Sequence, residues 1–172
     1  MRRRSFVFPV IVTVLIILII SYLFINIKQP YVECTRATVD DNNIKIIEDL
    51  KAGLDGNRIS SIYVEKTIIL PNTIPDREKF LESTKFALEH AYEYIEDNTE
   101  IIKNSDRVIL KVNLDKNGTV ILNNIEFINN GNLSIKINTN TKSSDVITLS
   151  IKDKYTEGEL MSRMKNNSYI CR

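Results

Sequence analysis

The sequence predicts an α+β fold: an N-terminal transmembrane helix, then an antiparallel sheet with one long and one short helix packed on one face. Three observations predict it. Residues 6–25 are an uncharged and almost wholly apolar run. Segments with β-branched residues and alternating polarity follow, separated by turn signals. One amphipathic helical pattern, with a shorter one near the C-terminus, interrupts them, and this order is typical of α+β domains.

The apolar run predicts a membrane anchor over residues 6–27. At about 1.5 Å per residue, twenty residues span roughly 30 Å, the thickness of a bilayer's hydrocarbon core. Arg2, Arg3 and Arg4 precede the run and only Lys28 follows it closely, which predicts a cytoplasmic N-terminus. We therefore expect a cytoplasmic stub (1–5), an anchor (6–27) and an extracytoplasmic α+β domain (28–172) on the cell membrane.

Two rival interpretations of this N-terminus were weighed. A cleaved signal peptide is disfavoured because no small-residue cleavage pair follows the run, although cleavage stays open. A lipoprotein anchor is excluded because Cys34 follows Glu33 rather than a small residue. A stub of about five residues is too short for a signalling domain. A single span without deep polar residues provides no channel in a monomer.

Seven strands and a short edge strand are predicted in the exported domain. The pair Asp55-Gly56 favours a tight hairpin between the second and third strands. A second hairpin is expected at Asp115-Lys116-Asn117-Gly118, pairing the strands on either side of it. The predicted strands are 31–39, 44–54, 59–70, 107–114, 119–128, 133–138, 145–152 and the edge strand 168–172.

Two helices are predicted in the same domain. The long helix covers residues 76–97, with Asp76 as N-cap and apolar residues along one stripe at helical spacing. Its acidic opposite face is typical of a solvated surface, with a docking surface as the alternative. The short helix covers residues 157–166, because Thr156 and Glu159 form a capping-box pattern.

The two cysteines, Cys34 and Cys171, lie near the two ends of the exported domain. In an oxidising compartment an even number of cysteines favours a disulfide, and these two are the only partners available. Two unrelated thiols are the alternative. A bond here would hold the C-terminal strand beside the first strand. A catalytic cysteine is disfavoured, because His90 is the only histidine and falls on a helix.

No catalytic residue, metal ligand or cofactor site is predicted. The pattern Asn113-x-Asp115-x-Asn117-Gly118 imitates the start of a calcium loop, but position 12 is Asn124 where a bidentate glutamate is needed, so a turn is favoured. His90 lacks the partners of a zinc site. The carboxylate pairs could do acid–base chemistry, although solvation is the default. These pairs are Glu89 with Glu93 and Asp40 with Asp41.

Charge argues against nucleic acid as a partner. All 22 acidic residues and all but four of the 23 basic residues lie in residues 31–172 of the exported domain, which are therefore mildly acidic. Its basic residues are scattered singly, whereas nucleic-acid-binding domains gather them in a patch.

Several short motifs carry a resemblance to a group of proteins. They are Cys34-Thr35 after the anchor, the hairpin Asp55-Gly56-Asn57, the charged helix from Asp76, and the ending Ser168-Tyr169-Ile170-Cys171-Arg172. With them the chain resembles uncharacterised small membrane-anchored proteins of low-GC Gram-positive bacteria. YehR-like lipoproteins are the nearest named comparison, from which the chain differs by lacking a lipidated cysteine. The resemblance implies no activity.

These observations predict a membrane-tethered extracytoplasmic binding or interaction module, more in keeping with a non-enzyme than an enzyme. Its expected partners are the membrane, through residues 6–27, and an unidentified protein or cell-envelope component. Two alternatives stay open: a cell-envelope enzyme that uses acidic residues, and a small subunit of a membrane complex.

Overall fold

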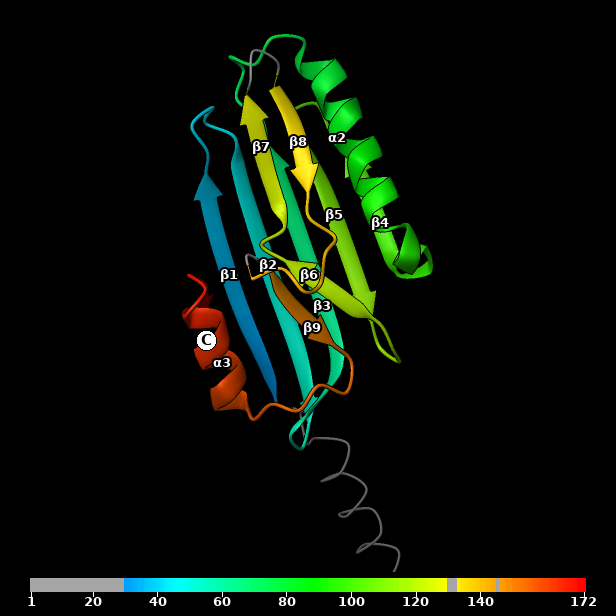
Figure 1. The fold of residues 1–172 in the computed structure, drawn as a ribbon, viewed down its shortest axis with the longest axis vertical. Coiled ribbons are helices and arrows are strands. Elements are labelled where there is room, and N and C mark those ends of the chain that lie inside the picture. Colours follow the sequence, from blue (N-terminus) through cyan, green and yellow to red (C-terminus); the bar gives the residue numbers. More distant parts are fainter. Residues whose placement is uncertain (1–29, 130–132, 145) are drawn as a thin grey trace, which may run out of the picture.

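The first layer of the structure is a large antiparallel sheet (Figure 1). The computed structural model describes residues 30–129, 133–144 and 146–172. Six strands lie in the order β10-β1-β2-β3-β5-β4. Every second side chain of β5 (Arg107–Leu114) is buried, as expected for a strand with one covered face. The others are β1 (Tyr31–Val39), β2 (Lys45–Asp55), β3 (Arg58–Ile69), β4 (Thr99–Lys103) and β10 (Ile170–Cys171).

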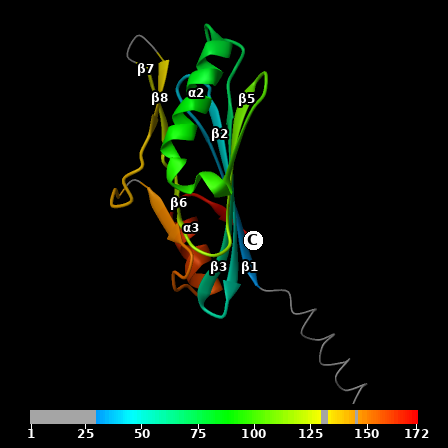
Figure 2. The ribbon, with the colours of Figure 1, turned by 90° about the vertical axis from the view of Figure 1, so that its right-hand side faces the viewer.

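A second layer covers one face of this sheet, and no described element covers the other face (Figure 2). Its middle consists of two small antiparallel sheets. The first pairs β6 (Thr119–Leu122) with β9 (Ile147–Ser150), and the second pairs β7 (Ile125–Asn129) with β8 (Leu133–Ile137).

Two α-helices complete the second layer at opposite margins of the sheet. Helix α2 (Arg77–Ala91) packs beside β4, β5 and β8, and the 3-10 helix η1 (Glu93–Asn98) follows it. Helix α3 (Glu157–Lys165) packs beside β1 and β10. Thr156 caps α3 through the predicted capping box with Glu159.

The hydrophobic core lies between the two layers. The inward side chains of the large sheet meet Leu81 and Leu88 of α2, and Leu160 and Met164 of α3, all of them fully buried. Strand β6 adds Val120 and Leu122. Burying this many aliphatic side chains is the main favourable contribution to folding, at about 25 cal/mol for each Å² of apolar surface.

The predicted fold class is wrong. Strands hold 47% of the described residues, and the covering layer contains two small sheets as well as helices, so the structure is mostly β rather than helices packed on a sheet. None of the helices in the described ranges is long and apolar enough to cross a membrane. The stub 1–5 and the predicted span 6–27 lie outside the described residues.

Three local predictions also need correction. The expected strand 119–128 is two strands that break at Asn123, where φ is 54°, and neither pairs with β5. The long helix ends at Ala91 rather than at residue 97, and its N-cap Asp76 makes no side-chain cap hydrogen bond. Strand β4 was not predicted, because its sequence Thr-Glu-Ile-Ile-Lys lacks clear alternation.

Candidate functional site

The candidate site is the face of the large sheet that no described element covers. We call it the open face: it is the side of the sheet that points away from the second layer (Figure 2), and we define it by the outward residues of β1 to β5. The strand register arranges these side chains in rows that run across the strands. Three neighbouring rows carry different kinds of side chain. An apolar row lies in the middle, with an acidic row on one side and a basic row on the other.

The central row is apolar. It crosses five strands, and the neighbours in it are directly paired: Ala37, Ile47, Thr67, Ile109 and Ile102. The three isoleucines are half-buried by their neighbours and Ala37 is exposed. With strands about 4.8 Å apart, this apolar row is roughly 20 Å long. Contiguous apolar surface of this kind on a soluble face marks an interaction site more often than isolated exposed side chains do.

On one side of the apolar row lies an acidic row. Its members are Thr35, Asp49, Glu65, Lys111 and Glu100. Thr35 donates a hydrogen bond of 2.6 Å to Asp49. The Lys111 ammonium lies 3.3 Å from the Glu100 carboxylate. Three carboxylates against one lysine leave the acidic row with a formal charge of −2.

On the other side lies a basic row, formed by Val39, Lys45, Ile69 and Arg107. Val39 is 62% exposed, an unusual value for a β-branched side chain on a strand. Asp106, next in the chain, holds Arg107 by a 2.6 Å ion pair and keeps the pKa of this guanidinium above its usual value. The two cations of the basic row carry a formal charge of +2, of which the Asp106 carboxylate offsets one.

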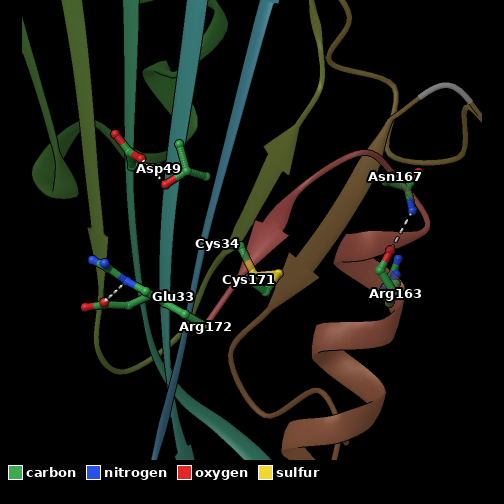
Figure 3. Close-up of a disulfide and its surroundings, with 8 residues drawn as sticks. Glu33, Cys34, Asp49, Arg163, Asn167, Cys171 and Arg172 are labelled. Atoms are coloured by element: carbon green, nitrogen blue, oxygen red, sulfur yellow. Dashed lines mark hydrogen bonds and ion pairs between the residues drawn. A yellow bond between two sulfur atoms is a disulfide. The ribbon is translucent and has the colours of Figure 1, made fainter.

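The predicted disulfide is confirmed at the margin of this face. Cys34 of β1 and Cys171 of β10 are directly opposite each other in the sheet, with Cα atoms 4.1 Å apart (Figure 3). Next to it, the Arg172 guanidinium lies 3.4 Å from the Glu33 carboxylate. A shallow hollow of about 460 Å³ opens here and is lined in part by Tyr63 and Ile170. The bond therefore fixes one edge of the open face.

A buried ion pair lies on the opposite, covered face of the same strands. Glu48 of β2 and Lys66 of β3 are direct cross-strand partners, and Nζ lies 2.8 Å from Oε1. The lysine side chain is 0% exposed and the glutamate side chain 5%. Charges this deep are rare unless they are paired and hydrogen-bonded.

The second layer supplies the remaining partners of this pair. Lys66 donates hydrogen bonds to the Ile121 carbonyl at 2.8 Å and to Asn124 Oδ1 at 2.5 Å. The backbone N–H of Asn123 donates to both oxygens of Glu48 at 3.1 Å, and the Tyr169 hydroxyl donates to Glu48 Oε2 at 2.7 Å. The pair thus fastens the link between β6 and β7 onto the large sheet.

Both members of the pair are held in the charged state. Burial alone would raise the pKa of Glu48, but the nearby Lys66 ammonium and the hydrogen bonds from Tyr169 and Asn123 lower it below the usual value. Burial likewise opposes a charge on Lys66, but the Glu48 carboxylate outweighs it and raises the pKa of the lysine. Because Lys66 is out of reach of solvent, we assign the pair a structural role beneath the open face, not a catalytic one.

Of the other residues considered for catalysis or metal binding, His90 and its neighbouring glutamates share a cavity at the end of α2. His90 is exposed on α2, and its ring contacts Phe86. Glu89 and Glu93 line a cavity of about 370 Å³ with His90 and Glu96. Across the described ranges, no group of three or more His, Cys, Asp or Glu is arranged to hold a metal.

The turn and loop candidates have plain structural roles. The calcium-like stretch from Asn113 to Gly118 links β5 to β6, so it joins the two layers and is not the hairpin turn expected. Asp40 accepts hydrogen bonds from the backbone N–H groups of Asn42 and Ile44, which closes the turn before β2.

Sequence reasoning missed both the open face and the Glu48–Lys66 pair. A signal for the pair was present, because Glu48 and Lys66 each alternate with apolar residues that become core. The open face had no equivalent signal. Its isoleucines look like core residues in a sequence, and they stay uncovered because the described part of the chain places no third layer on this face.

Comparisons with known proteins bring no further information. No family model, no curated protein and no solved structure matches the chain.

Proposed function

We propose that this chain is an extracytoplasmic interaction module that binds a protein partner across the open face of its sheet. The apolar row carries the proposal. It places three isoleucines and an alanine in one line on a face that no described element covers. An apolar centre between charged rows is the usual anatomy of a protein–protein interface.

Two further observations support an exported binding module. The Cys34–Cys171 disulfide fits an oxidising compartment, because reducing conditions in the cytosol keep most thiols unpaired. The buried Glu48–Lys66 pair and the disulfide both brace the strands that carry the open face. A rigid surface loses less conformational entropy on binding than a flexible one. The location at a cell membrane stays a prediction, since residues 6–27 lie outside the described part of the chain.

Site-specific photo-crosslinking in the producing cells tests the proposal. A photoreactive amino acid is introduced at Thr67, in the middle of the apolar row, and in a matched control at Asn117, which is exposed in the turn after β5. We expect a discrete crosslinked protein product from position 67 and none from position 117. Absence of any product at position 67, or the same products at both positions, would contradict the proposal.

One observation favours the enzyme alternative enough to test it. The cavity at the end of α2 is lined by Glu89, Glu93 and Glu96, so several carboxylates share one hollow. Carboxylates in a cleft can act as general acid and base. Under this alternative, Glu93→Gln would abolish the cellular function while crosslinking at Thr67 stayed unproductive. Under our proposal, Glu93→Gln leaves the function intact.

A further inference from the structure

Strand β4 is the last strand at one margin of the large sheet, where α2 lies beside it (Figure 1). We infer that this edge binds an extended basic segment of a protein, which pairs with β4 as a further antiparallel strand and places a lysine or arginine side chain in the cavity at the end of α2. The site is separate from the open face and goes beyond the function proposed for that face. Edge strands that accept a peptide gain affinity from backbone hydrogen bonds and specificity from pockets for alternate side chains.

The hydrogen bonds of β4 show which of its backbone groups are free. The N–H of Asn104, which follows β4, donates to the Arg107 carbonyl at 2.9 Å and so points toward β5. Backbone groups alternate in direction along an antiparallel strand, so those of Ile102 also point toward β5, whereas those of Ile101 and Lys103 point out from the edge. In the described ranges, no backbone group bonds to this outer side of Ile101 and Lys103. They therefore offer donors and acceptors to an added strand.

The devices that usually protect an edge strand do not close this one. Proline, a bulge or a lysine that projects from the edge commonly prevents pairing with another chain. The sequence of β4, Thr-Glu-Ile-Ile-Lys, contains no proline, and its five pairs with β5 are in unbroken register. Its one lysine, Lys103, is drawn onto α2 by ion pairs with Glu78 and Glu82. The outer side of β4 is therefore open to backbone pairing.

The cavity at the end of α2 lies beside this edge. It has a volume of about 370 Å³, and its lining includes Thr99 and Ile101 of β4 together with residues of α2 and η1. In an antiparallel ladder, two directly paired residues point their side chains to the same face of the sheet. Because the Ile101 side chain lines the cavity, the peptide residue paired with Ile101 directs its own side chain into the same cavity.

Charge selects a basic side chain for this cavity. Three carboxylates line it, and in the described ranges only that of Glu89 has an ion-pair partner, the Lys85 ammonium at 3.0 Å. The other two belong to Glu93 and Glu96. With the two glutamates that share Lys103, five carboxylates lie along this edge against two lysines, a formal charge of −3. A lysine or arginine is attracted here, whereas a second copy of this chain would bring two acidic edges together.

An exposed aromatic side chain lies next to the cavity. Phe86 is 61% exposed on α2, and its ring centroid is 4.2 Å from that of His90, which lines the cavity. It lies one helical turn after Glu82, which contacts β4, and about one turn before Glu89, so it belongs to the side of α2 that faces this edge. An aromatic ring in this position can hold the aliphatic stem or the cation of a lysine or arginine.

Binding of synthetic peptides to the purified full chain tests this inference. The probe is a fluorescent seven-residue peptide in which lysine alternates with threonine, and binding is measured by fluorescence anisotropy. When the lysines point into the cavity, their own N–H groups face β4 and those of the threonines face solvent. We expect N-methylation of the lysine amides to weaken binding about tenfold or more, and N-methylation of the threonine amides to change it less than about twofold. A peptide with glutamate in place of lysine should bind at least about tenfold more weakly.

Charge variants of the chain test the cavity. Glu89→Lys/Glu96→Lys should weaken binding of the lysine peptide about tenfold or more. The matched control is Asp41→Lys/Glu126→Lys, which makes the same change in net charge at exposed positions outside the cavity and should change binding less than about twofold. A neutral change at one site, Glu93→Gln, leaves the other carboxylates in place and should have a similarly small effect. Unchanged urea midpoints show that the variants are folded.

Amide hydrogen exchange locates the bound peptide. With the lysine peptide at saturation, exchange at Ile101 and Lys103 should slow about tenfold or more, because their N–H groups become bonded, whereas Ile102, already paired with β5, should change little. No binding of the lysine peptide, equal binding of the peptide N-methylated at lysine, or unchanged exchange at Ile101 would each overturn the inference. Thr67 lies on the open face, so crosslinking there tests the proposed function independently of these results.

Discussion

Replacing Glu48 by glutamine should destabilise the protein by about 3–5 kcal/mol, the usual cost of leaving one member of a buried ion pair without its partner. The substitution keeps size and shape but removes the only carboxylate within 4.0 Å of the Lys66 ammonium among the described residues. Lys66 would keep only neutral acceptors, the Ile121 carbonyl and Asn124 Oδ1, while remaining 0% exposed.

The reverse substitution, Lys66→Met, should cost less. Glu48 would keep hydrogen bonds from the Asn123 backbone and the Tyr169 hydroxyl, and the Arg36 guanidinium lies 3.9 Å from it. Glu48→Gln/Lys66→Met should be less destabilised than the sum of its parts, with a coupling energy of about 2 kcal/mol or more.

Urea unfolding followed by far-ultraviolet circular dichroism measures these effects. With a slope of about 1–3 kcal/mol per molar urea, a loss of 3–5 kcal/mol moves the midpoint by more than 1 M. A loss below about 1 kcal/mol in Glu48→Gln would refute the reasoning, because it lies far under the cost expected for an unpaired buried charge. Equal losses in both single variants would refute the asymmetry between the two partners.

The pH dependence of the same measurement provides a control. The pKa of Glu48 is lowered in the folded state, so its stabilisation is fully present above the unfolded value of 4.5 and is lost as the pH falls through the lower folded value. The pKa of Lys66 is raised, so its stabilisation is present below 10.5 and is lost as the pH rises through the higher folded value. The advantage of the wild type over Glu48→Gln should therefore be full above about pH 5 and shrink in acid, and it should also shrink toward alkaline pH, because burial then favours the neutral form of the unpaired Lys66 in the variant.

Three further perturbations have defined outcomes. Cys34→Ser/Cys171→Ser should lower the free energy of unfolding by up to about 5 kcal/mol, since the bond closes a loop with a sequence separation of 137; an unchanged thermal midpoint would contradict this. Thr156→Ala should cost about 1 kcal/mol through loss of the capping box, and Thr156→Ser should recover most of it in urea unfolding. Burial and the hydrogen bond to Glu65 raise the pKa of Tyr63 to about 12, so in an ultraviolet absorbance titration Glu65→Gln should move it back toward 10.

Most strands of the large sheet could be predicted because their signals are local. Residues 107–114 alternate in polarity with period two, residues 31–39 are rich in β-branched side chains, and the structure has β1 and β5 over the same residues. The capping box of α3 and the Cys34–Cys171 bond were also predictable, the first from a four-residue pattern and the second from the number of cysteines. The calcium-like turn was misjudged as a hairpin, because no local signal tells whether a chain returns beside its own strand or crosses to another layer.

The pairing register of β2 with β3 determines which residues lie on the open face and which lie in the core. Local sequence patterns do not predict this register. The tight turn pairs Asp55 with Arg58, and an unbroken ladder from there would put Glu48 opposite Glu65. The irregularity at Gly53 and Leu54 shifts the pairing by one residue and puts Glu48 opposite Lys66 instead. A one-residue shift exchanges the faces of a strand, so this bulge also places Glu65 on the open face.

By itself, the sequence determined most strands of the large sheet, where α3 begins and which cysteines can pair, because these properties depend on neighbouring residues or on simple counting. Only the tertiary structure decided which isoleucines are core and which lie on the open face. Ile46 and Ile47 are adjacent and chemically identical, yet one is buried under the second layer and the other faces outward. The physical reason is that the pleat assigns alternate residues to opposite faces, whereas the covering of a face depends on elements far away in the chain.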